Sequence, residues 1–475
     1  MTTTARPSDA LAPDVLAQAG EEVVETLRDL IRIPSVNPPP EPGDGELRAA
    51  RYVASVLTDA GLRPEVVEPF PGRGSVHARL RGDGTGGEPF LLLSHLDVVP
   101  APPAEWTHDP FDGDVADGHV YGRGAVDMKD LIAQQLGVVH LLAAEARAAG
   151  RDPASDPIPG LTRDVLFTST ADEEAGGFEG VGWIVEHRPE WLQAEGAINE
   201  CGGVAVTVGD KRVYPIQVAE KGFAVYRIHV HGTWGHGSMP REDNAAVLAA
   251  SIIARLAKPG EIRVTPVMRH FVETTAEALG GELATTLLGL LGDDPMTSER
   301  RLAACDAMYA RALRALVRDT ISPDVIHSGI KYNVIPGEAT LEIDCRVLPG
   351  MTEADARRVV EERIGPDLMA ACKIELVIYA EPVESPHHHP LFGLLADALR
   401  DHDPDAIPVP FMVPFATDAK HTTGMGVPTF GFSPLKLAPE ERFLERFHGV
   451  DERVAIDALQ WGVPVLYDVV RRFCG

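Results

Sequence analysis

Residues 91–100, LLLSHLDVVP, form the stretch that decides the fold. The apolar run at 90–93 has the length and residue types of a strand that is buried on both faces. The strand ends in His95 and Asp97, whose side chains point to the same face because they are two residues apart. Asp97 can then accept a hydrogen bond from one ring nitrogen of His95, which strengthens the imidazole as a metal ligand. An isolated His-x-Asp pair more often marks a polar loop after a core strand, so the rest of the chain must decide.

Length and charge limit the classes of protein to consider. A chain of 475 residues is longer than one hydrophobic core supports, which predicts two domains. Acidic residues outnumber basic ones by 71 to 43, giving a formal net charge of -28. Nucleic acids and anionic membranes both require clustered Lys and Arg, so neither is expected as a partner.

Cysteine usage and hydropathy add two further expectations. The five cysteines form no CxxC pair, which argues against a disulfide framework or a thiolate zinc site; they are Cys201, Cys305, Cys345, Cys372 and Cys474. No stretch resembles a signal peptide and no apolar run reaches 18 residues, so a cytoplasmic location is expected.

Helical and strand patterns alternate in the first part of the chain. Helical spacing appears at 21–33, 45–60 and 128–149, and apolar strand patterns appear at 65–68, 76–80, 90–93 and 165–168. Polar residues follow several of these strands. The pattern predicts an α/β/α sandwich around a mixed sheet, in which ligands bind beyond the carboxyl ends of the strands.

The pattern changes near residue 217. Strictly alternating residues at 224–231 predict a half-exposed antiparallel strand. A helix at 244–256, strands at 325–334 and 339–347, a helix at 353–364 and a strand at 373–380 complete the β-α-β-β-α-β order of the ferredoxin-like plan. We expect an α+β domain at 217–380, with an extra helical segment at about 270–318, inserted into a discontinuous domain formed by 1–216 and 381–475.

Five side chains are candidate metal ligands: His95, Asp127, Glu174, Glu200 and His448. Four of them lie at or just beyond the ends of predicted strands in one domain, so one edge of the sheet can gather them. Imidazole and carboxylate groups without thiolates suit zinc, or a similar divalent ion, in a catalytic role. Five ligands exceed the needs of one catalytic metal, which keeps an open position, but fit two metals that share a carboxylate.

The motifs around these residues resemble those of family twenty of the metallopeptidases, the group of aminoacylase, acetylornithine deacetylase, succinyl-diaminopimelate desuccinylase and glutamate carboxypeptidase. They are SHLDVVP (94–100), YGRGAVDMKD (121–130), ADEEAGG (171–177), INECGG (198–203) and FHGVDE (447–452). The resemblance extends from about residue 20 to the end of the chain. It implies a catalytic domain of the aminopeptidase type with an inserted ferredoxin-like dimerisation (lid) domain.

The resemblance also implies a metal centre. Two Zn²⁺ ions per subunit, with Co²⁺ or Mn²⁺ as substitutes, would be bridged by Asp127. His95 and Glu200 would complete one site, and Glu174 and His448 would complete the other.

Further roles are implied for residues around the metals. Asp97 would orient the first ligand imidazole, and Glu173 would be the general base. The inserted domain would form a homodimer and lend a His to the partner's active site, and GTWGHGSMP (232–240) nominates His236. Asn333 in KYNVIPG and Arg346 in DCRVLPG match positions that hold the carboxylate of the substrate.

Three features leave alternatives open. Arg346 can instead pair with Asp344 or Glu342, which lie on its own face of the strand. Asp130 and Cys201 each stand where the family usually has Gly. Neither departure removes a ligand, but both alter the wall of the site and therefore bear on substrate preference.

The expected reaction is hydrolysis of an amide bond in a small substrate with a free carboxylate, by a water between two metals whose proton passes to Glu173. Short peptides, N-acyl amino acids and N-acylated biosynthetic intermediates all remain candidate substrates. The long second domain favours a peptidase or acylase over a dedicated biosynthetic deacylase of the acetylornithine or succinyl-diaminopimelate type. A non-catalytic metal-binding scaffold and a Cys201 nucleophile are the alternatives from other classes.

Overall fold

The computed structural model describes residues 6–38, 43–292, 294–303 and 307–475. The chain divides into two compact units. The first unit comprises Met1–Val218, Ser385–Phe411 and Thr417–Gly475, and the second comprises Ala219–Glu384 and Met412–Ala416. Cys305 lies outside the described residues, and the other four cysteines are free thiols. None of the described helices is long and apolar enough to cross a membrane.

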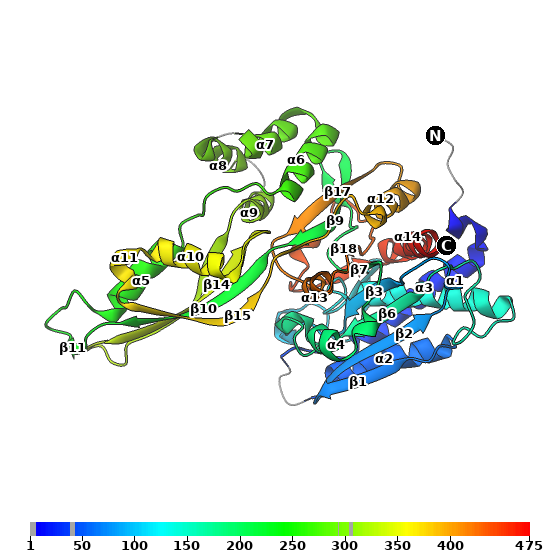
Figure 1. The fold of residues 1–475 in the computed structure, drawn as a ribbon, viewed down its shortest axis with the longest axis horizontal. Coiled ribbons are helices and arrows are strands. Elements are labelled where there is room, and N and C mark those ends of the chain that lie inside the picture. The colour runs from blue at the N-terminus through cyan, green and yellow to red at the C-terminus, as the bar shows by residue number, and fades with distance from the viewer. Residues whose placement is uncertain (1–5, 39–42, 293, 304–306) are drawn as a thin grey trace. The chain divides into compact units, whose positions relative to one another are not determined.

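A mixed sheet forms the centre of the first unit (Figure 1). Its strands lie in the order β1-β2-β6-β3-β7-β18-β9. The pairs β3–β6, β3–β7 and β7–β18 are parallel, whereas β1–β2, β2–β6 and β9–β18 are antiparallel. The bounds are β1 Glu65–Phe70, β2 Arg73–Leu80, β3 Phe90–His95, β6 Val165–Thr170, β7 Gly196–Asn199, β9 Lys211–Glu220 and β18 Thr429–Gly431.

Further strands, of which β8 and β17 pair with β9, and seven helices complete the described part of this unit. The strands are β4 Val115–Ala116, β5 His119–Tyr121, β8 Val206–Val208, β17 Ala406–Val413 and β19 Arg453–Ala455. The helices are α1 Pro13–Ile31, α2 Gly45–Asp59, α3 Lys129–Ala148, α4 Val181–His187, α12 Pro390–His402, α13 Ala419–Gly424 and α14 Ile456–Cys474. Short 3₁₀ turns are η1 Pro7–Ala10, η2 Pro103–Glu105, η3 Glu173–Ala175, η4 Pro189–Trp191 and η5 Phe443–Glu445.

Strand β3 explains why this unit is layered. All six of its residues are buried, as is typical of a parallel strand with both faces covered. Leu91 and Leu93 pack in one cluster with Val181 of α4. Phe90 points to the opposite face, where its ring lies 4.9 Å from that of Phe473 in α14. Helices therefore cover both faces of the sheet, and the predicted α/β/α class is confirmed.

The second unit contains a four-stranded antiparallel sheet in the order β12-β14-β10-β15. Its elements are β10 Gly222–His231, α5 Ala245–Leu256, β12 Thr320–Ser328, β14 Glu338–Val347, α10 Glu353–Ile364, α11 Pro366–Met369 and β15 Cys372–Ala380. Chain order and sheet order are those of the ferredoxin-like plan. Helices α5, α10 and α11 lie along one face of the sheet (Figure 1).

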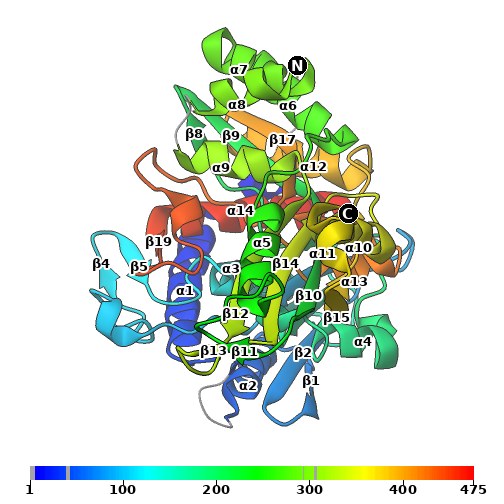
Figure 2. The ribbon, with the colours of Figure 1, turned by 90° about the vertical axis from the view of Figure 1, so that its left-hand side faces the viewer.

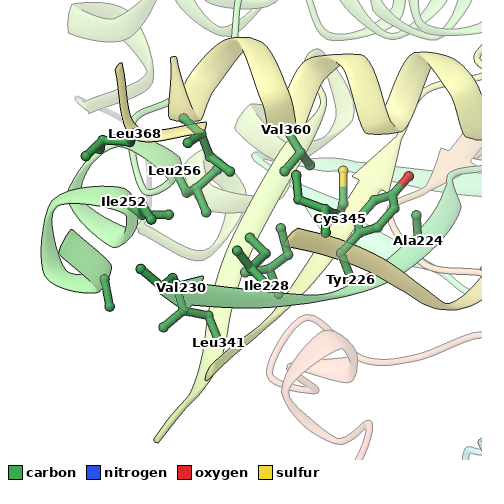
Figure 3. Close-up of a cluster of buried hydrophobic side chains, with 14 of the residues drawn as sticks. Ala224, Tyr226, Ile228, Val230, Ile252, Leu256, Leu341, Cys345, Val360 and Leu368 are labelled. Atoms are coloured by element: carbon green, nitrogen blue, oxygen red, sulfur yellow. The ribbon is translucent and has the colours of Figure 1, made fainter. Parts of the chain in front are cut away.

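The core of the second unit follows directly from the alternation along β10. Its inward side chains, which include Tyr226, Ile228 and Val230, are fully buried. They pack with Ile252 of α5 and Val360 of α10 in a single apolar cluster (Figure 3). The period of two in the sequence is thus explained by helices that cover only one face.

Additional elements of the second unit are four helices and three short strands within its described residues. The helices α6 Pro266–Leu279, α7 Gly281–Gly292, α8 Pro295–Ala303 and α9 Ala307–Leu316 form the extra helical segment, which groups apart from the sheet in Figure 2. The strands are β11 Gly235–His236, β13 Val334–Ile335 and β16 Val383–Glu384.

One predicted strand was misplaced. The sequence predicted a strand at 325–334, whereas β12 begins at Thr320 and ends at Ser328. Pro323 is accommodated because β12 is an edge strand, where a missing N–H removes no hydrogen bond. Gly329, with a φ of 76°, then turns the chain out of the sheet, and Val334–Ile335 pairs with β11 instead.

Candidate metal centre

The five predicted ligands lie in the first unit, on elements that meet at one edge of its sheet. His95 ends β3, Glu200 follows β7, and Glu174 lies in η3 beyond β6. Strands β6, β3 and β7 are parallel neighbours, so their carboxyl ends lie together. Asp127 precedes α3, and His448 precedes β19.

Asp127 lies between the two imidazoles. Its Oδ1 is 3.3 Å from His95 Nε2, and its Oδ2 is 3.3 Å from His448 Nε2. His95 Nε2 also lies 3.5 Å from Glu200 Oε1, and His448 Nε2 lies 3.2 Å from Glu174 Oε2. Each imidazole therefore faces its own carboxylate together with one oxygen of the shared Asp127.

Among the described residues, two groups of ligand atoms are close enough to hold a metal ion. One group is His95, Glu173 and Glu200; the other is Asp127, Glu174 and His448. Within each group the atoms lie within 4.8 Å of one another. The structure thus brings together all five predicted ligands and the predicted base Glu173.

Unsatisfied buried atoms indicate that a cation belongs here. His95 Nε2 and Glu174 Oε1 are buried and have no hydrogen-bond partner. Buried polar atoms normally find a partner, and an ion is one that meets this need. The observed separations of 3.2 to 3.5 Å match the distance of about 3.4 Å between two atoms that are tetrahedral ligands of one zinc ion. The residues present therefore fit two zinc ions.

The electrostatics lead to the same conclusion. Burial raises the pKa of Glu173 and Glu200 and raises that of Glu174 to about 7. Hydrogen bonds with Asp127 and Glu174 raise the pKa of His448 to about 10. Several carboxylates share a small buried volume, and a divalent cation would relieve their mutual repulsion.

Asp97 is fully buried beside this group. His95 Nδ1 lies 3.0 Å from the backbone carbonyl oxygen of Asp97 and 3.5 Å from its carboxylate Oδ1. The nearer acceptor for the imidazole is therefore the carbonyl oxygen of Asp97, not its side chain. Either contact would orient the ring.

The remaining predicted site residues lie in the second unit. His236 in β11 is exposed, and its Nδ1 is 2.8 Å from Ser238 Oγ. Asn333 adjoins this turn because its carbonyl accepts the amide of Gly237 at 2.9 Å. The amide oxygen of Asn333 is buried and has no hydrogen-bond partner. These two residues therefore lie next to each other.

Arg346 forms the ion pair that was anticipated as its alternative role. Its Nε and Nη2 donate to the carboxylate of Asp344 at 2.8 and 2.9 Å. Its guanidinium also lies over the ring of Phe223, 5.1 Å from the centroid. Glu342 pairs with Arg227 instead.

Sequence reasoning missed the groups that join the ligand loops. Glu452 is fully buried and accepts hydrogen bonds from Arg123 at 2.5 Å and from the amide of Val126 at 2.9 Å. It therefore links the loop of Asp127 to the loop of His448. The only signal for it was its place at the end of FHGVDE.

This chain is similar to known proteins in both sequence and fold. The model of peptidase family M20/M25/M40 matches residues 91–472. The chain belongs to this family. The predicted family and the predicted class of hydrolase acting on amide bonds are confirmed.

Several relatives match nearly the whole chain, and two of them illustrate the range. The N-fatty-acyl-amino acid synthase/hydrolase PM20D1 of Xenopus tropicalis is 27% identical over 95% of this chain and 86% of its own. Aminoacylase-1 of Sus scrofa is 26% identical over 94% of each chain. Among solved structures, the M20 family metallo-carboxypeptidase Sso-CP2 from Sulfolobus solfataricus has a similar fold, with a TM-score of 0.70 at 16% identity, over 95% of this chain and 99% of its own.

The metal centre leads to a first prediction. Asp127→Asn removes the charge shared by both ligand groups and should reduce bound zinc from about two ions per chain to less than one. Elemental analysis of the purified variant measures this. Asp130→Asn is the matched control, since Asp130 is a buried acid in neither ligand group and should leave the zinc content unchanged. Full zinc content in Asp127→Asn would contradict a bridging role.

Proposed function

We propose that this chain is a di-zinc hydrolase that cleaves the amide bond of a small substrate bearing a free carboxylate, either a short peptide or an N-acyl amino acid. The observation that carries the proposal is the pair of imidazoles on either side of Asp127, with Glu173 close by. The two imidazoles face different oxygens of Asp127 and belong to different groups of ligand atoms, so a single ion would leave one group without a cation. A scaffold without turnover would have no use for Glu173.

The chain's own residues supply the proton transfers in this reaction. Bound zinc ions would polarise the scissile carbonyl and make a water molecule more acidic. Glu173 takes the proton of the attacking water and later delivers it to the leaving nitrogen. Burial and the nearby Glu200 raise the pKa of Glu173, which favours its acting as the acid once it has taken up the proton.

We also propose that the second unit forms a homodimer and lends His236 to the active site of the partner subunit, where it stabilises the developing oxyanion. Several apolar side chains near His236 are exposed in the single chain, which supports an interface with a second subunit at this surface. Trp234 and Met239 flank His236 in sequence, and Tyr332, which adjoins Asn333, is 95% exposed.

Asn333 and Arg346 are proposed to hold the carboxylate of the substrate. For Asn333 the group that would donate to the carboxylate is the side-chain Nδ2, because the amide oxygen can only accept hydrogen bonds. The pair with Asp344 fixes the plane of the Arg346 guanidinium and leaves its Nη1 as a further donor.

Relatives favour N-acyl amino acids and peptides over a dedicated biosynthetic substrate. Relatives that match nearly the whole chain include proteins named as an N-fatty-acyl-amino acid synthase/hydrolase and an aminoacylase, and a probable carboxypeptidase S-like protein of Dictyostelium discoideum matches 81% of it. A succinyl-diaminopimelate desuccinylase of Methylorubrum extorquens is 36% identical, but over only 44% of this chain. We therefore place the deacylase of biosynthetic intermediates second.

The direct test is a substrate panel with the zinc-loaded protein. Dipeptides, N-acetyl amino acids and N-acyl amino acids with long chains are compared with their C-terminal amides. We expect hydrolysis of at least one class and loss of it when the carboxylate is amidated, because the free carboxylate fixes the substrate. Absence of hydrolysis across the panel would favour a scaffold, and equal rates for the amides would exclude recognition of the carboxylate.

A second prediction concerns the base. Glu173→Gln should retain zinc and fold but lower kcat about 10²- to 10⁴-fold, because it removes the proton acceptor while all five proposed ligands, His95, Asp127, Glu174, Glu200 and His448, remain. Zinc analysis and steady-state kinetics measure the two effects. Glu186→Gln, an exposed change in α4, should leave both near wild type. A Glu173→Gln variant with normal turnover would exclude Glu173 as the base.

A third prediction tests whether His236 acts in the partner's site. His236→Ala alone should lower kcat while leaving the zinc content unchanged. Mixing His236→Ala with Glu173→Gln subunits should restore about a quarter of wild-type activity, because half of randomly formed dimers contain one complete site out of two. Failure of two inactive variants to restore activity after subunit exchange, verified by mass, would contradict donation between subunits.

A further inference from the structure

The Asp97 carboxylate binds the turn that carries the proposed base. Its Oδ1 accepts the amide of Glu173 at 3.1 Å, and its Oδ2 accepts the amide of Glu174 at 3.0 Å. Both oxygens are thus engaged by consecutive peptide groups from η3. The imidazole of His95 finds its shorter contact at the backbone carbonyl of Asp97. The geometry therefore gives the carboxylate a second task, which is to fix the backbone of Glu173 and Glu174.

Asn37 holds that carboxylate from the other side. Its Nδ2 donates to Asp97 Oδ2 at 2.8 Å and lies 3.3 Å from Asp172 Oδ1. Its side chain is buried, and its backbone amide donates to the carbonyl of Val98 at 2.9 Å. Asn37 therefore contacts both the strand end that carries Asp97 and the residue that precedes the Glu173 turn.

Arg73 in β2 fixes Asn37 and balances the surrounding charge. Its Nη2 donates to Asn37 Oδ1 at 2.9 Å, and its Nη1 donates to both oxygens of Glu46 at 2.8 Å. Glu46 in turn accepts the amide of Asp172 at 3.0 Å. The Arg73 guanidinium thus joins β2, the loop of Asn37 and helix α2 next to Asp97 and Asp172. The fixed fork of donors in a guanidinium suits this arrangement better than an ammonium group.

Asp172 has a backbone conformation that requires such support. Its φ of 71° lies in the left-handed region, which is costly for a residue with a side chain. The carboxylate of Glu46 accepts a hydrogen bond from the amide of Asp172. The Oδ2 of Asp172 accepts a hydrogen bond from the amide of Glu179 at 2.9 Å. This turn directs the next two residues, Glu173 and Glu174, toward the metal centre.

We propose that Asn37 and Arg73 are positioning residues that hold the Asp97 carboxylate in the orientation that fixes Glu173 and Glu174, so that base and ligand are placed by one contact network. The catalytic consequence rests on the proposed function of Glu173. The structural consequence, a turn held by Asp97, does not.

The test compares variants of Asn37 in the full chain. Asn37→Asp keeps the shape but removes the donor and adds a third carboxylate beside Asp97 and Asp172. Asn37→Ala removes both the donor to Asp97 and the acceptor for Arg73, and Asn37→Ser retains a shorter donor. Glu186→Gln is the control, because Glu186 is exposed in α4 and takes no part in the contacts around Asp97 and Asp172 described above.

Two readouts are measured with and without zinc. Amide hydrogen exchange of the peptide spanning 172–177 should become about tenfold faster in Asn37→Ala, as expected from the loss of a buried hydrogen bond to a charged group. The value of kcat should fall about 10- to 100-fold with KM within about twofold of wild type, as for other groups that support metal sites. Asn37→Asp should exceed Asn37→Ala in both effects, Asn37→Ser should recover part of each, and Glu186→Gln should match wild type.

The outcomes separate this inference from the proposed function. Unchanged exchange and unchanged kcat in a folded Asn37→Ala, with an active wild type, would overturn the positioning role alone. Faster exchange in Asn37→Ala, together with a wild type that hydrolyses no amide, would support the positioning of the Glu173 turn by Asp97 and reject the proposed function. If Asn37→Ala does not fold, the other two variants decide. Exchange and kcat equal to those of wild type in both Asn37→Ser and Asn37→Asp would overturn the inference.

Discussion

Concentration of negative charge in a buried volume is the constraint on which the rest of the first unit depends. Asp127, Glu173, Glu174 and Glu200 gather around two imidazoles, with Asp97 directly behind them. Burial raises the pKa of Glu173, Glu174 and Glu200, that of Glu174 to about 7, whereas hydrogen bonds with the two imidazoles lower the pKa of Asp127 despite its burial. Divalent cations offer the alternative of keeping the carboxylates ionised while satisfying the buried atoms that lack partners. The site therefore makes physical sense as a metal centre and not as a set of ion pairs.

Two features of the fold bring these side chains together. They are the order of neighbouring parallel strands and buried side-chain hydrogen bonds between loops. Parallel neighbours β6, β3 and β7 bring three of the ligand-bearing segments to one edge, which is a consequence of sheet order. The two ligands that come from loops need separate support. Glu452 provides it by binding Arg123 and the amide of Val126, so that the loops of Asp127 and His448 are held together across more than three hundred residues of chain. Regular structure places the strand-end ligands, and buried hydrogen bonds place the others.

This division explains how much the sequence could predict. The fold class followed from hydrophobic periodicity, and the five candidate ligands followed from short motifs, most of them at or near predicted strand ends, because both signals are local in sequence. The strand at 325–334 was misplaced, since the edge position that tolerates Pro323 depends on pairing that the sequence does not display. Asn37 and Arg73 were missed for the same reason. Asn37 lies in a Pro-rich loop and meets Asp97 sixty residues later, so only the tertiary structure brings the two together.

The two departures from the family pattern change the wall of the site without adding charge to it. Burial raises the pKa of Asp130 to about 8, so its carboxyl group is mostly protonated at neutral pH and donates or accepts like an amide beside Ser433. Burial and the nearby Glu200 raise the pKa of Cys201 well above its usual value, which keeps the thiol protonated. A protonated thiol is a poor nucleophile, so the alternative in which Cys201 attacks the substrate loses its chemical basis. Neither residue therefore contributes a negative charge, and the predicted ligands set the balance between carboxylates and cations. Asp130 and Cys201 act instead through the shape and polarity of the site.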